Sequence, residues 1–242
     1  MSLIIPEWNV PATVRALATT RLGGISGPPW DALNLGAHVG DSPTDVQINR
    51  QRLVERAELP AMPVWLEQIH GIKVLHLTDK QPHSLQADAA YTRERGVVCA
   101  VMTADCLPVL FCSRDGKEIA AAHAGWRGLC AGVLEATLDA FRAKAEDIFV
   151  WMGPAIGPDA FEVGPEVRKA FIAQDLTADA AFRAVGEKYY ADIWQLARTR
   201  LVRRGVREIT GGGLCTLSDQ RQFFSFRRDG VTGRMASLIW LI

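Results

Sequence analysis

Short apolar stretches of strand length dominate the middle of the chain. They follow one another from residue 64 onwards, and glycine, proline or polar turns separate them. Stretches of this length with such punctuation are typical of buried strands. We therefore expect strands at 64–69, 73–77, 96–103, 107–112, 118–123 and 148–153, and further strands within 207–215, 222–228 and 235–242.

Helical spacing of apolar side chains appears in four other segments. In 128–144, for example, Leu129, Val133 and Leu138 fall on one side of a helix, so that face would pack on the sheet. We expect helices at 44–59, with Ser42 or Thr44 as the cap and Pro43 in the first turn, and at 128–144, 165–174 and 190–204. The first forty residues are rich in Gly, Pro and Asp, which predicts a structured N-terminal segment rich in loops. Together these segments predict a single mixed α/β domain over residues 1–242.

Charge and cysteine content narrow the class of protein. The chain has 27 Lys and Arg against 27 Asp and Glu, so no overall field favours a nucleic acid or an anionic membrane as partner. We find no signal peptide and no apolar run long enough to span a bilayer. The five cysteines include no C-x-x-C pair, which argues against a disulfide framework or a zinc ribbon. We expect a cytoplasmic protein with reduced thiols.

Three residues at strand ends carry the candidate chemistry. His70 ends EQIHG, Cys106 lies in MTADCLPVLF, and His123 ends a strand in AAAHAGWRG. Two imidazoles and one thiolate that converge from separate strands would leave a fourth position open, as in catalytic zinc sites. Cys106 is equally consistent with a nucleophile activated by His70 or His123, or with a buried thiol. Residue types and spacing leave all three readings open.

Other polar residues offer a site for an anion. Arg127 directly precedes the helix expected from Gly128, so its charge and the free amides of the first turn would attract phosphate. Arg21 and Arg227 stand near glycines that let backbone approach a ligand. Asp105, beside Cys106, could orient a histidine or carry a proton. The remaining thiols of Cys99, Cys112 and Cys130 lie in apolar segments and are expected in the core.

Taken together, the motifs resemble the YfiH family, also called the laccase-domain or multicopper polyphenol oxidoreductase family. The resemblance covers nearly the whole chain. It rests on TTRLGGISGPPWDALNLGAHVGD, WLEQIHG, ADAAYT, MTADCLPVLF, AAAHAGWRGLCAGVLEAT, GPAIGPDAFEVG and FFSFRRDGVTGRMASLIWLI.

The resemblance implies a four-layer α/β/β/α fold related to the catalytic domain of cytotoxic necrotising factor. It also implies a metal held by His70, Cys106 and His123, and a substrate site that adds His38 and Gln68 to Arg21, Arg127 and Arg227. Family members are similar to purine nucleoside phosphorylases that also split methylthioadenosine and deaminate adenosine. The implied partners are therefore a purine nucleoside and phosphate, with Cys106, Asp105 and Arg127 as catalytic candidates.

Zinc is the expected metal, because two histidines and one cysteine are fewer ligands than a multicopper centre needs, although thiolate and imidazole also suit Cu²⁺. One alternative function is a hydrolase with Cys106 as nucleophile on a cell-wall precursor, since one family member is described as a peptidoglycan editing factor. Copper-dependent oxidation of polyphenols and a non-catalytic binding module are the others. We expect a monomer or a weak homo-oligomer.

Overall fold

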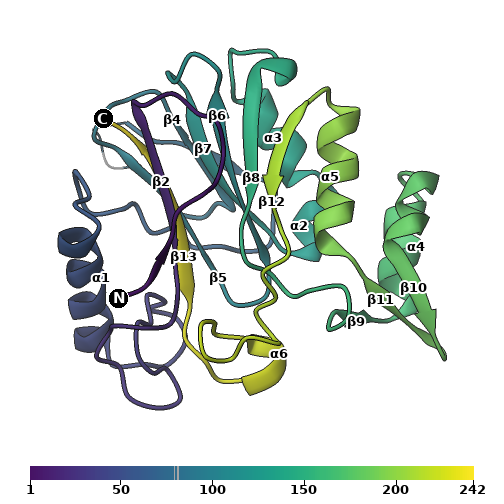
Figure 1. Ribbon diagram of the computed structural model, residues 1–242, viewed down its shortest axis with the longest axis horizontal. Helices are drawn as coiled ribbons and strands as arrows, with labels where there is room; N and C mark the ends of the chain where they lie inside the picture. The colour runs from purple at the N-terminus through teal and green to yellow at the C-terminus, as the bar shows by residue number, and fades with distance from the viewer. Residues whose placement is uncertain (79, 81) are drawn as a thin grey trace.

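The computed structural model describes residues 1–78, 80 and 82–242. Two sheets pack face to face at its centre, and helices cover the outer face of each (Figure 1). The result is the mixed α/β architecture with several sheets expected from the sequence, in the layer order helix, sheet, sheet, helix. None of the helices in the described part of the chain is long and apolar enough to cross a membrane.

The smaller of the two sheets is fully antiparallel. Its four strands lie in the order β1 (Leu3–Ile4), β2 (Val14–Thr19), β13 (Met235–Leu241) and β5 (Val98–Thr103). All seven residues of β13 are buried. Alternate side chains of β5 and β13 enter the core between the sheets, and the others face α1 (Pro43–Arg56). Because both faces are covered, the strands are apolar at nearly every position instead of alternating with polar residues.

The larger sheet is mixed. Its parallel pairs are β12–β8 and β3–β4, and the remaining neighbours are antiparallel. The order of its six strands is β12 (Glu208–Gly211), β8 (Ile148–Met152), β6 (Leu107–Ser113), β7 (Ile119–Ala124), β4 (Ala89–Thr92) and β3 (Val74–His76). Its inner face supplies Leu110, Cys112 and Ala121 to the core between the sheets.

Helices cover the outer face of the larger sheet. They are α2 (Trp126–Ala131), α3 (Val133–Asp139) and α5 (Ile193–Arg203), and their apolar side chains form one core with that face. A smaller unit projects beyond α5 in Figure 1. It contains α4 (Pro165–Ile172), the three-stranded sheet of β9 (Glu162–Val163), β10 (Phe182–Val185) and β11 (Lys188–Ala191), and the 3₁₀ helix η2 (Leu176–Ala181). The remaining short elements are η1 (Ala145–Asp147) and α6 (Phe226–Asp229).

Most expected elements are present, and α1 begins as expected, with the Ser42 side chain accepting from the Asp45 amide and Pro43 in the first turn. The expected single helix at 128–144 was wrong. Gly132 adopts a left-handed conformation with φ of 109° and separates α2 from α3. Likewise the helix expected from 190 starts at Ile193, because Lys188–Ala191 pairs as β11.

Two further expectations at strand level were wrong. Segment 64–69 makes only isolated bridges. The Gln68 side chain occupies the backbone groups of Met102 in β5: its NH₂ group donates to the Met102 carbonyl and its oxygen accepts from the Met102 N–H, each at 2.7 Å. These groups are therefore not free to pair with a strand at 64–69. Segment 222–228 is a turn followed by α6. The N-terminal segment is also more regular than expected, since it contains β1 and β2.

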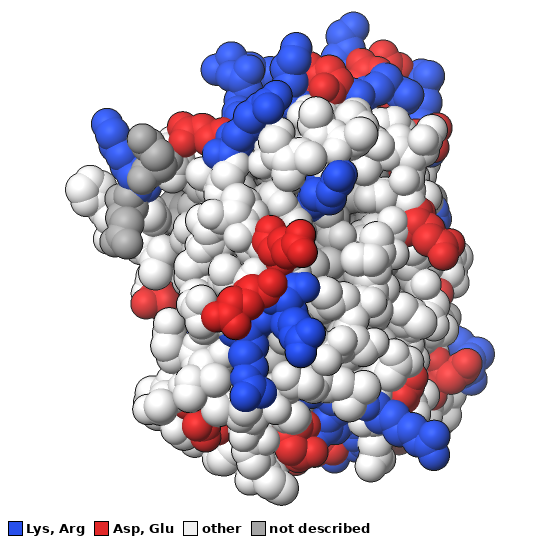
Figure 2. Space-filling model, turned by 60° about the vertical axis from the view of Figure 1, so that its left-hand side comes forward, with Lys and Arg blue, Asp and Glu red and all other residues white. Residues whose placement is uncertain are grey.

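Charged side chains are dispersed over the face that Figure 2 shows. Basic and acidic residues lie beside one another in small groups, separated by wide uncharged areas (Figure 2). This distribution agrees with the formal net charge of zero. On this face no continuous basic band is visible of the kind that a phosphate backbone would require.

Candidate metal centre and adjoining cavity

The folded chain brings His70, Cys106 and His123 together. Cys106 lies between β5 and β6, and His123 lies near the end of β7. One ligand atom from each residue lies within 4.8 Å of the others, and Cys106 Sγ is 3.8 Å from His70 Nε2. The two imidazole rings meet edge to face, with their centroids 4.8 Å apart. The described residues contain no other such cluster of three His, Cys, Asp or Glu side chains.

Asp88 organises two of these three ligands. Its fully buried carboxylate accepts hydrogen bonds from the backbone amides of Ile69, His70 and Gly71, at 3.2, 2.9 and 2.7 Å. The same carboxylate lies 2.8 Å from Nδ1 of His123. A carboxylate can only accept, so Nδ1 carries a hydrogen and Nε2 of His123 is the nitrogen that a metal would bind.

The bonds to Asp88 also explain the backbone at His70, whose φ of 60° is unusual for a residue other than glycine. Three successive amides converge on one carboxylate there, which stabilises a conformation that would otherwise be strained. Burial alone would raise the pKa of Asp88, but hydrogen bonds from His123 and Gly71 outweigh it and lower that pKa. Asp88 is therefore a charged acceptor at the centre of the site.

Two glycines next to the cluster, Gly125 and Gly128, are packed so closely that neither position has room for a side chain. A Cβ at Gly125 would lie 2.8 Å from Cδ2 of His70 and 3.0 Å from Sγ of Cys106. A Cβ at Gly128 would lie 2.8 Å from the carbonyl oxygen of Gly71. Glycine at both positions lets α2 approach the segment that carries His70.

The charges of the cluster shift the pKa of its thiol and of one imidazole in opposite directions. Burial would raise the pKa of the Cys106 thiol, but the neighbouring imidazoles of His123 and His70 lower it to about 6. Burial would lower the pKa of His123, but the Cys106 thiolate and Asp88 raise it to about 9. At neutral pH the metal-free site thus holds a Cys106 thiolate beside a His123 imidazolium. A metal ion bound at this site would replace one proton of His123 and pair with the thiolate in its place.

The donor set fits a zinc ion. Two imidazole nitrogens and one thiolate are ligands of a catalytic zinc, which keeps one position open for water or substrate. The Asp88–His123 pair is the carboxylate–imidazole arrangement that commonly orients such a ligand.

A cavity of about 500 Å³ opens over this cluster. Aromatic and aliphatic side chains form much of its wall, with arginines between them. Besides the three ligands its lining includes His38, Gln68, Met102, Asp105, Trp126, Arg127, Ile156, Phe161, Phe226, Arg227 and Arg234. A cavity of this size, mostly apolar with a few polar groups, is typical of small-molecule sites.

Four of the five expected substrate-binding residues, His38, Gln68, Arg127 and Arg227, line this cavity. The guanidinium of Arg127 stacks on Trp126 at 4.5 Å, within the first turn of α2 and not before it as expected. Arg227 donates to the Glu162 carbonyl. The Gln68 amide is occupied by Met102.

Arg21 is not among the residues that line the cavity. Its guanidinium donates to the carbonyls of Asp31 and Gln220, pairs with the Asp31 carboxylate at 3.3 Å and stacks on Phe224 at 4.7 Å. With all of its nitrogens occupied, it joins the N-terminal segment to the loop before α6.

Asp105 lines the cavity, but its carboxylate is directed into the protein. One oxygen accepts from the Thr216 hydroxyl at 2.6 Å, and the other accepts from the Ser225 hydroxyl and the Arg227 amide at 3.0 and 2.7 Å. Asp105 adopts a φ of 91°, and these bonds join the residue next to Cys106 to the start of α6. The geometry favours a positioning role over proton transfer.

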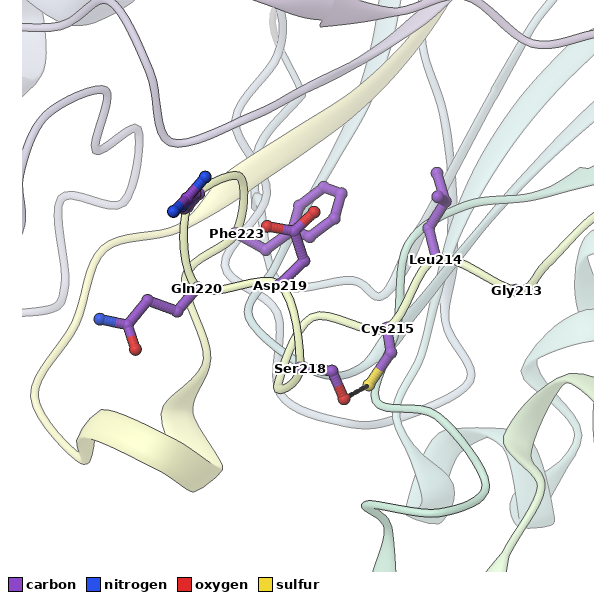
Figure 3. Close-up of a pocket in the computed structure, with 8 residues that line it drawn as sticks. Gly213, Leu214, Cys215, Ser218, Asp219, Gln220 and Phe223 are labelled. Atoms are coloured by element: carbon purple, nitrogen blue, oxygen red, sulfur yellow. Dashed lines mark hydrogen bonds between the residues drawn. The ribbon is translucent and has the colours of Figure 1, made fainter.

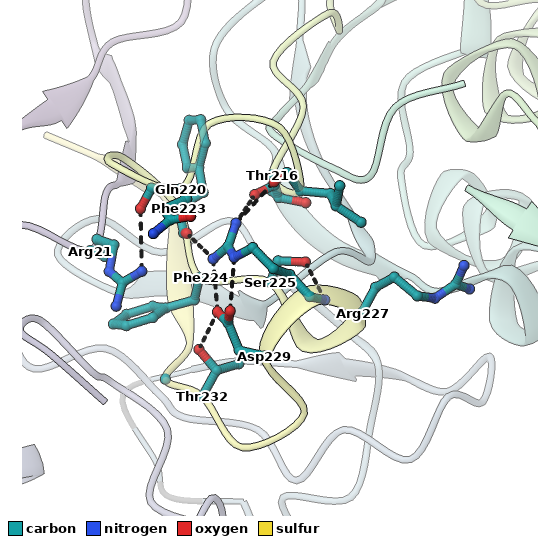
Figure 4. A network of polar contacts seen from close by, with 12 residues as sticks. Arg21, Thr216, Gln220, Phe223, Phe224, Ser225, Arg227, Asp229 and Thr232 are labelled. Carbon is teal, nitrogen blue, oxygen red and sulfur yellow. Dashed lines mark hydrogen bonds and ion pairs between the residues drawn. The ribbon is translucent and has the colours of Figure 1, made fainter. Parts of the chain in front are cut away.

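Arg228 organises the loop that leads into α6 (Figure 4). Its guanidinium donates to the carbonyls of Thr216, Leu217 and Phe223, each at 3.0 Å, and pairs with Asp229. Binding these carbonyls closes 216–229 into a compact loop, which explains why the phenylalanine-rich segment 222–228 does not form a strand. The loop in turn positions Phe226 and Arg227 at the cavity.

The other cysteines lie outside the ligand cluster. Cys99, Cys112 and Cys130 are buried in the apolar cores, as expected. Cys215 borders a separate depression, where its sulfur accepts from the Gly157 amide and the Ser218 hydroxyl at 3.2 and 3.3 Å (Figure 3).

Sequence reasoning missed two residues of this site. Asp88 appeared only within the motif ADAAYT, and nothing in its local sequence signals that its carboxylate faces His123. Arg234 lies just before β13, and its presence in the cavity follows from the position of that strand.

Comparisons with known proteins show the family of this chain. Residues 15–242 match the sequence model of a family described as multi-copper polyphenol oxidoreductase laccase. The chain is 60% identical over 240 residues, 99% of each chain, to a protein of Escherichia coli strain K12 named purine nucleoside phosphorylase YfiH. It is 53% identical, over 98% of each chain, to purine nucleoside phosphorylase PA4543 of Pseudomonas aeruginosa.

A solved structure has the same fold. The Neisseria meningitidis protein NMB0706 superposes with a TM-score of 0.96 at 47% identity, covering 100% of this chain and 99% of that one. The chain therefore belongs to the YfiH family, whose sequence model describes a multi-copper polyphenol oxidoreductase laccase.

Proposed function

We propose that this protein is a zinc-dependent purine nucleoside phosphorylase that acts on adenosine, inosine and methylthioadenosine. The observation that carries the proposal is the position of the His70, Cys106 and His123 cluster at a cavity of about 500 Å³ lined by arginines and aromatic rings. The names of the relatives in Escherichia coli and Pseudomonas aeruginosa support it. The five free cysteines fit a reducing compartment such as the cytoplasm.

In this reaction a phosphate oxygen bonds to C1′ of the ribose while the bond from C1′ to N9 of the purine breaks. The electron pair stays with the base, which takes up a proton, and the products are the free purine and ribose 1-phosphate. Arg127 and Arg227 would attract the phosphate by charge, and Trp126, Phe161 and Phe226 offer ring faces to the purine. A zinc ion held by the three ligands would act as a Lewis acid toward substrate oxygen or water.

The proposal includes adenosine deamination in the same cavity. There the oxygen of water replaces the amino group at C6, and ammonia leaves. Asp105 is left out of the proton transfer, because Thr216, Ser225 and Arg227 already donate to its two oxygens.

The direct test is product analysis with purified protein, with and without phosphate. We expect adenine and ribose 1-phosphate from adenosine only when phosphate is present, and none from a Cys106→Ala variant. Ammonia release without phosphate would measure the deaminase reaction separately. Release of adenine at the same rate without phosphate would contradict a phosphorylase.

One observation favours a second candidate, a cysteine hydrolase on a cell-wall precursor. Cys106 has a pKa of about 6 and lies 3.8 Å from His70 Nε2, the pairing that activates a thiol nucleophile. Chelation separates the candidates, because it would abolish the zinc enzyme and leave a thiol hydrolase active. Alkylation abolishes both. A copper polyphenol oxidase would instead require copper in the purified protein and turnover of phenols.

A further inference from the structure

Arg234 differs from the other arginines of the cavity in its burial. Arg127 and Arg227 are exposed, whereas Arg234 is half-buried beside Cys106, Asp105 and His38. None of these three arginines forms an ion pair with a carboxylate among the described residues. Burying a guanidinium without a counter-ion is unfavourable, so Arg234 would gain most from an anionic ligand.

The side chain of Arg234 is held in place by its neighbours. Its Nη1 donates to the carbonyls of Thr232 and Gly233 at 3.1 and 3.0 Å, and its backbone amide donates to Asn34 Oδ1 at 2.9 Å. Its Cγ packs so closely on Gly36 that a Cβ there would lie 2.7 Å away. The orientation of this guanidinium is therefore set before any ligand binds.

Two of its nitrogens remain without a partner in the described part of the chain. Nε and Nη2 make no hydrogen bond, whereas Nε, Nη1 and Nη2 of Arg21 and of Arg228 are all occupied. Arg21 and Arg228 thus have structural roles, and Arg234 keeps the donor pair that fits two oxygens of a phosphate.

The nearest negative charges do not satisfy these donors. The Cys106 thiolate and Asp105 act on Arg234 only through their charge, and they partly offset the lowering of its pKa by burial. Both oxygens of Asp105 already accept from Thr216, Ser225 and the Arg227 amide. A metal on Cys106 would also neutralise the thiolate, which leaves the need for an anion beside Arg234 greater than before.

We propose that Arg234 binds the phosphate that attacks the nucleoside, with its free Nε and Nη2 donating to two phosphate oxygens. This inference rests on the proposed phosphorylase function and names a residue that directly contacts its anionic substrate. Arg127 and Arg227 then add charge at the exposed part of the cavity, and Arg21 has no part in binding.

The test compares Arg234→Gln and Arg234→Lys with the wild type and with Arg221→Gln, an exposed arginine at the separate depression of Figure 3. Calorimetric titration with inorganic phosphate, at constant ionic strength, measures binding without turnover. The KM values for phosphate and adenosine are then measured separately. Thermal melting checks that each variant folds, and the Lys variant carries the test if the Gln variant does not fold.

We expect Arg234→Gln to weaken phosphate binding and raise its KM by about 10- to 100-fold, the effect of losing charged hydrogen bonds, while the KM for adenosine changes little. Lys keeps the charge but not the paired donors and should be intermediate. Arg221→Gln should match the wild type. Phosphate binding within twofold of wild type in Arg234→Gln would overturn the proposal, as would the absence of phosphate binding by the wild type. Arg234-dependent phosphate binding without phosphorolysis would refute the proposed function, and Arg234 would then be an anion-binding residue without a part in phosphorolysis.

Discussion

Replacing Asp88 by Asn tests how the protein prepares its metal ligands. The substitution keeps the size of the side chain and exchanges one carboxylate oxygen for an NH₂ group. In the native protein one oxygen of Asp88 accepts from His70 N and His123 Nδ1, and the other accepts from Ile69 N and Gly71 N. Whichever way the Asn amide is oriented, its NH₂ group faces two donors.

The expected loss follows from these contacts. Each hydrogen bond to a buried charged acceptor contributes about 1.5–3 kcal/mol, so two lost bonds predict a decrease of about 3–6 kcal/mol in the free energy of unfolding. If the NH₂ group faces His123, Nδ1 must become the acceptor, and Nε2 then carries the hydrogen and cannot bind metal. Loss of such an outer carboxylate typically lowers metal affinity by about 10- to 100-fold.

Urea unfolding and competitive zinc titration measure the two effects. Asp179→Asn is the control, because its ion pair with Arg168 is exposed to solvent and should contribute little. Asp88→Glu keeps the charge but displaces it, so it should recover part of the stability and little of the affinity. The reasoning is refuted if Asp88→Asn binds zinc within twofold of the wild type and unfolds at the same urea concentration.

Other perturbations address the neighbouring contacts. Gly125→Ala places a Cβ 2.8 Å from His70 and 3.0 Å from the Cys106 sulfur, so dialysed protein should retain much less zinc than Gly27→Ala, where the new Cβ meets nothing within 4 Å; equal zinc contents would contradict this packing. In metal-free protein the pKa of Cys106 is lowered to about 6, so iodoacetamide should alkylate it rapidly at neutral pH and more slowly as the pH falls through about 6. Bound zinc should block the reaction. If the alkylation rate instead has its pH midpoint near the pKa of free cysteine, Cys106 is not a thiolate at neutral pH. Arg228→Ala removes the bonds to the carbonyls of Thr216, Leu217 and Phe223. It should lower the free energy of unfolding by about 2–4 kcal/mol and speed proteolysis within 216–229. The control Arg198→Ala loses one bond to Ile209 and should change both quantities little.

The pH dependence of the metal-free fold follows from the same pair. The pKa of Cys106 is lowered, so its contribution to stability is present at high pH and is lost as the pH falls through about 6. The pKa of His123 is raised, so its contribution is present at low pH and is lost as the pH rises through about 9. Stability relative to a Cys106→Ser variant should therefore be greatest between these values.

Sequence patterns predicted the sheets better than the loops. β5 and β13 are apolar at nearly every position because they lie between a helix layer and a second sheet, and such runs are readable without a structure. Segment 222–228 contains three phenylalanines and was predicted as a strand for that reason, but the Arg228 guanidinium binds the surrounding carbonyls and folds it into a loop. Long-range contacts of this kind leave no local periodicity.

The candidate site shows the same division. His70, Cys106 and His123 could be singled out because each ends an apolar stretch beside a turn, and the resemblance to a family joined them into one ligand set. Asp88 has no such signal, since its role depends on a contact with His123, which lies 35 residues further along the chain. Arg21 was selected for its neighbouring glycines, yet the fold directs it to Asp31 and Phe224.

Elemental analysis of the purified protein tests the central claim, that His70, Cys106 and His123 form one metal centre. The wild type should contain about one zinc ion per chain, as expected for a site with a single set of ligands. Cys106→Ala should lose it, and Cys112→Ala, which alters a thiol in the core, should keep it. Zinc retained at full stoichiometry by Cys106→Ala would contradict the assignment of this centre.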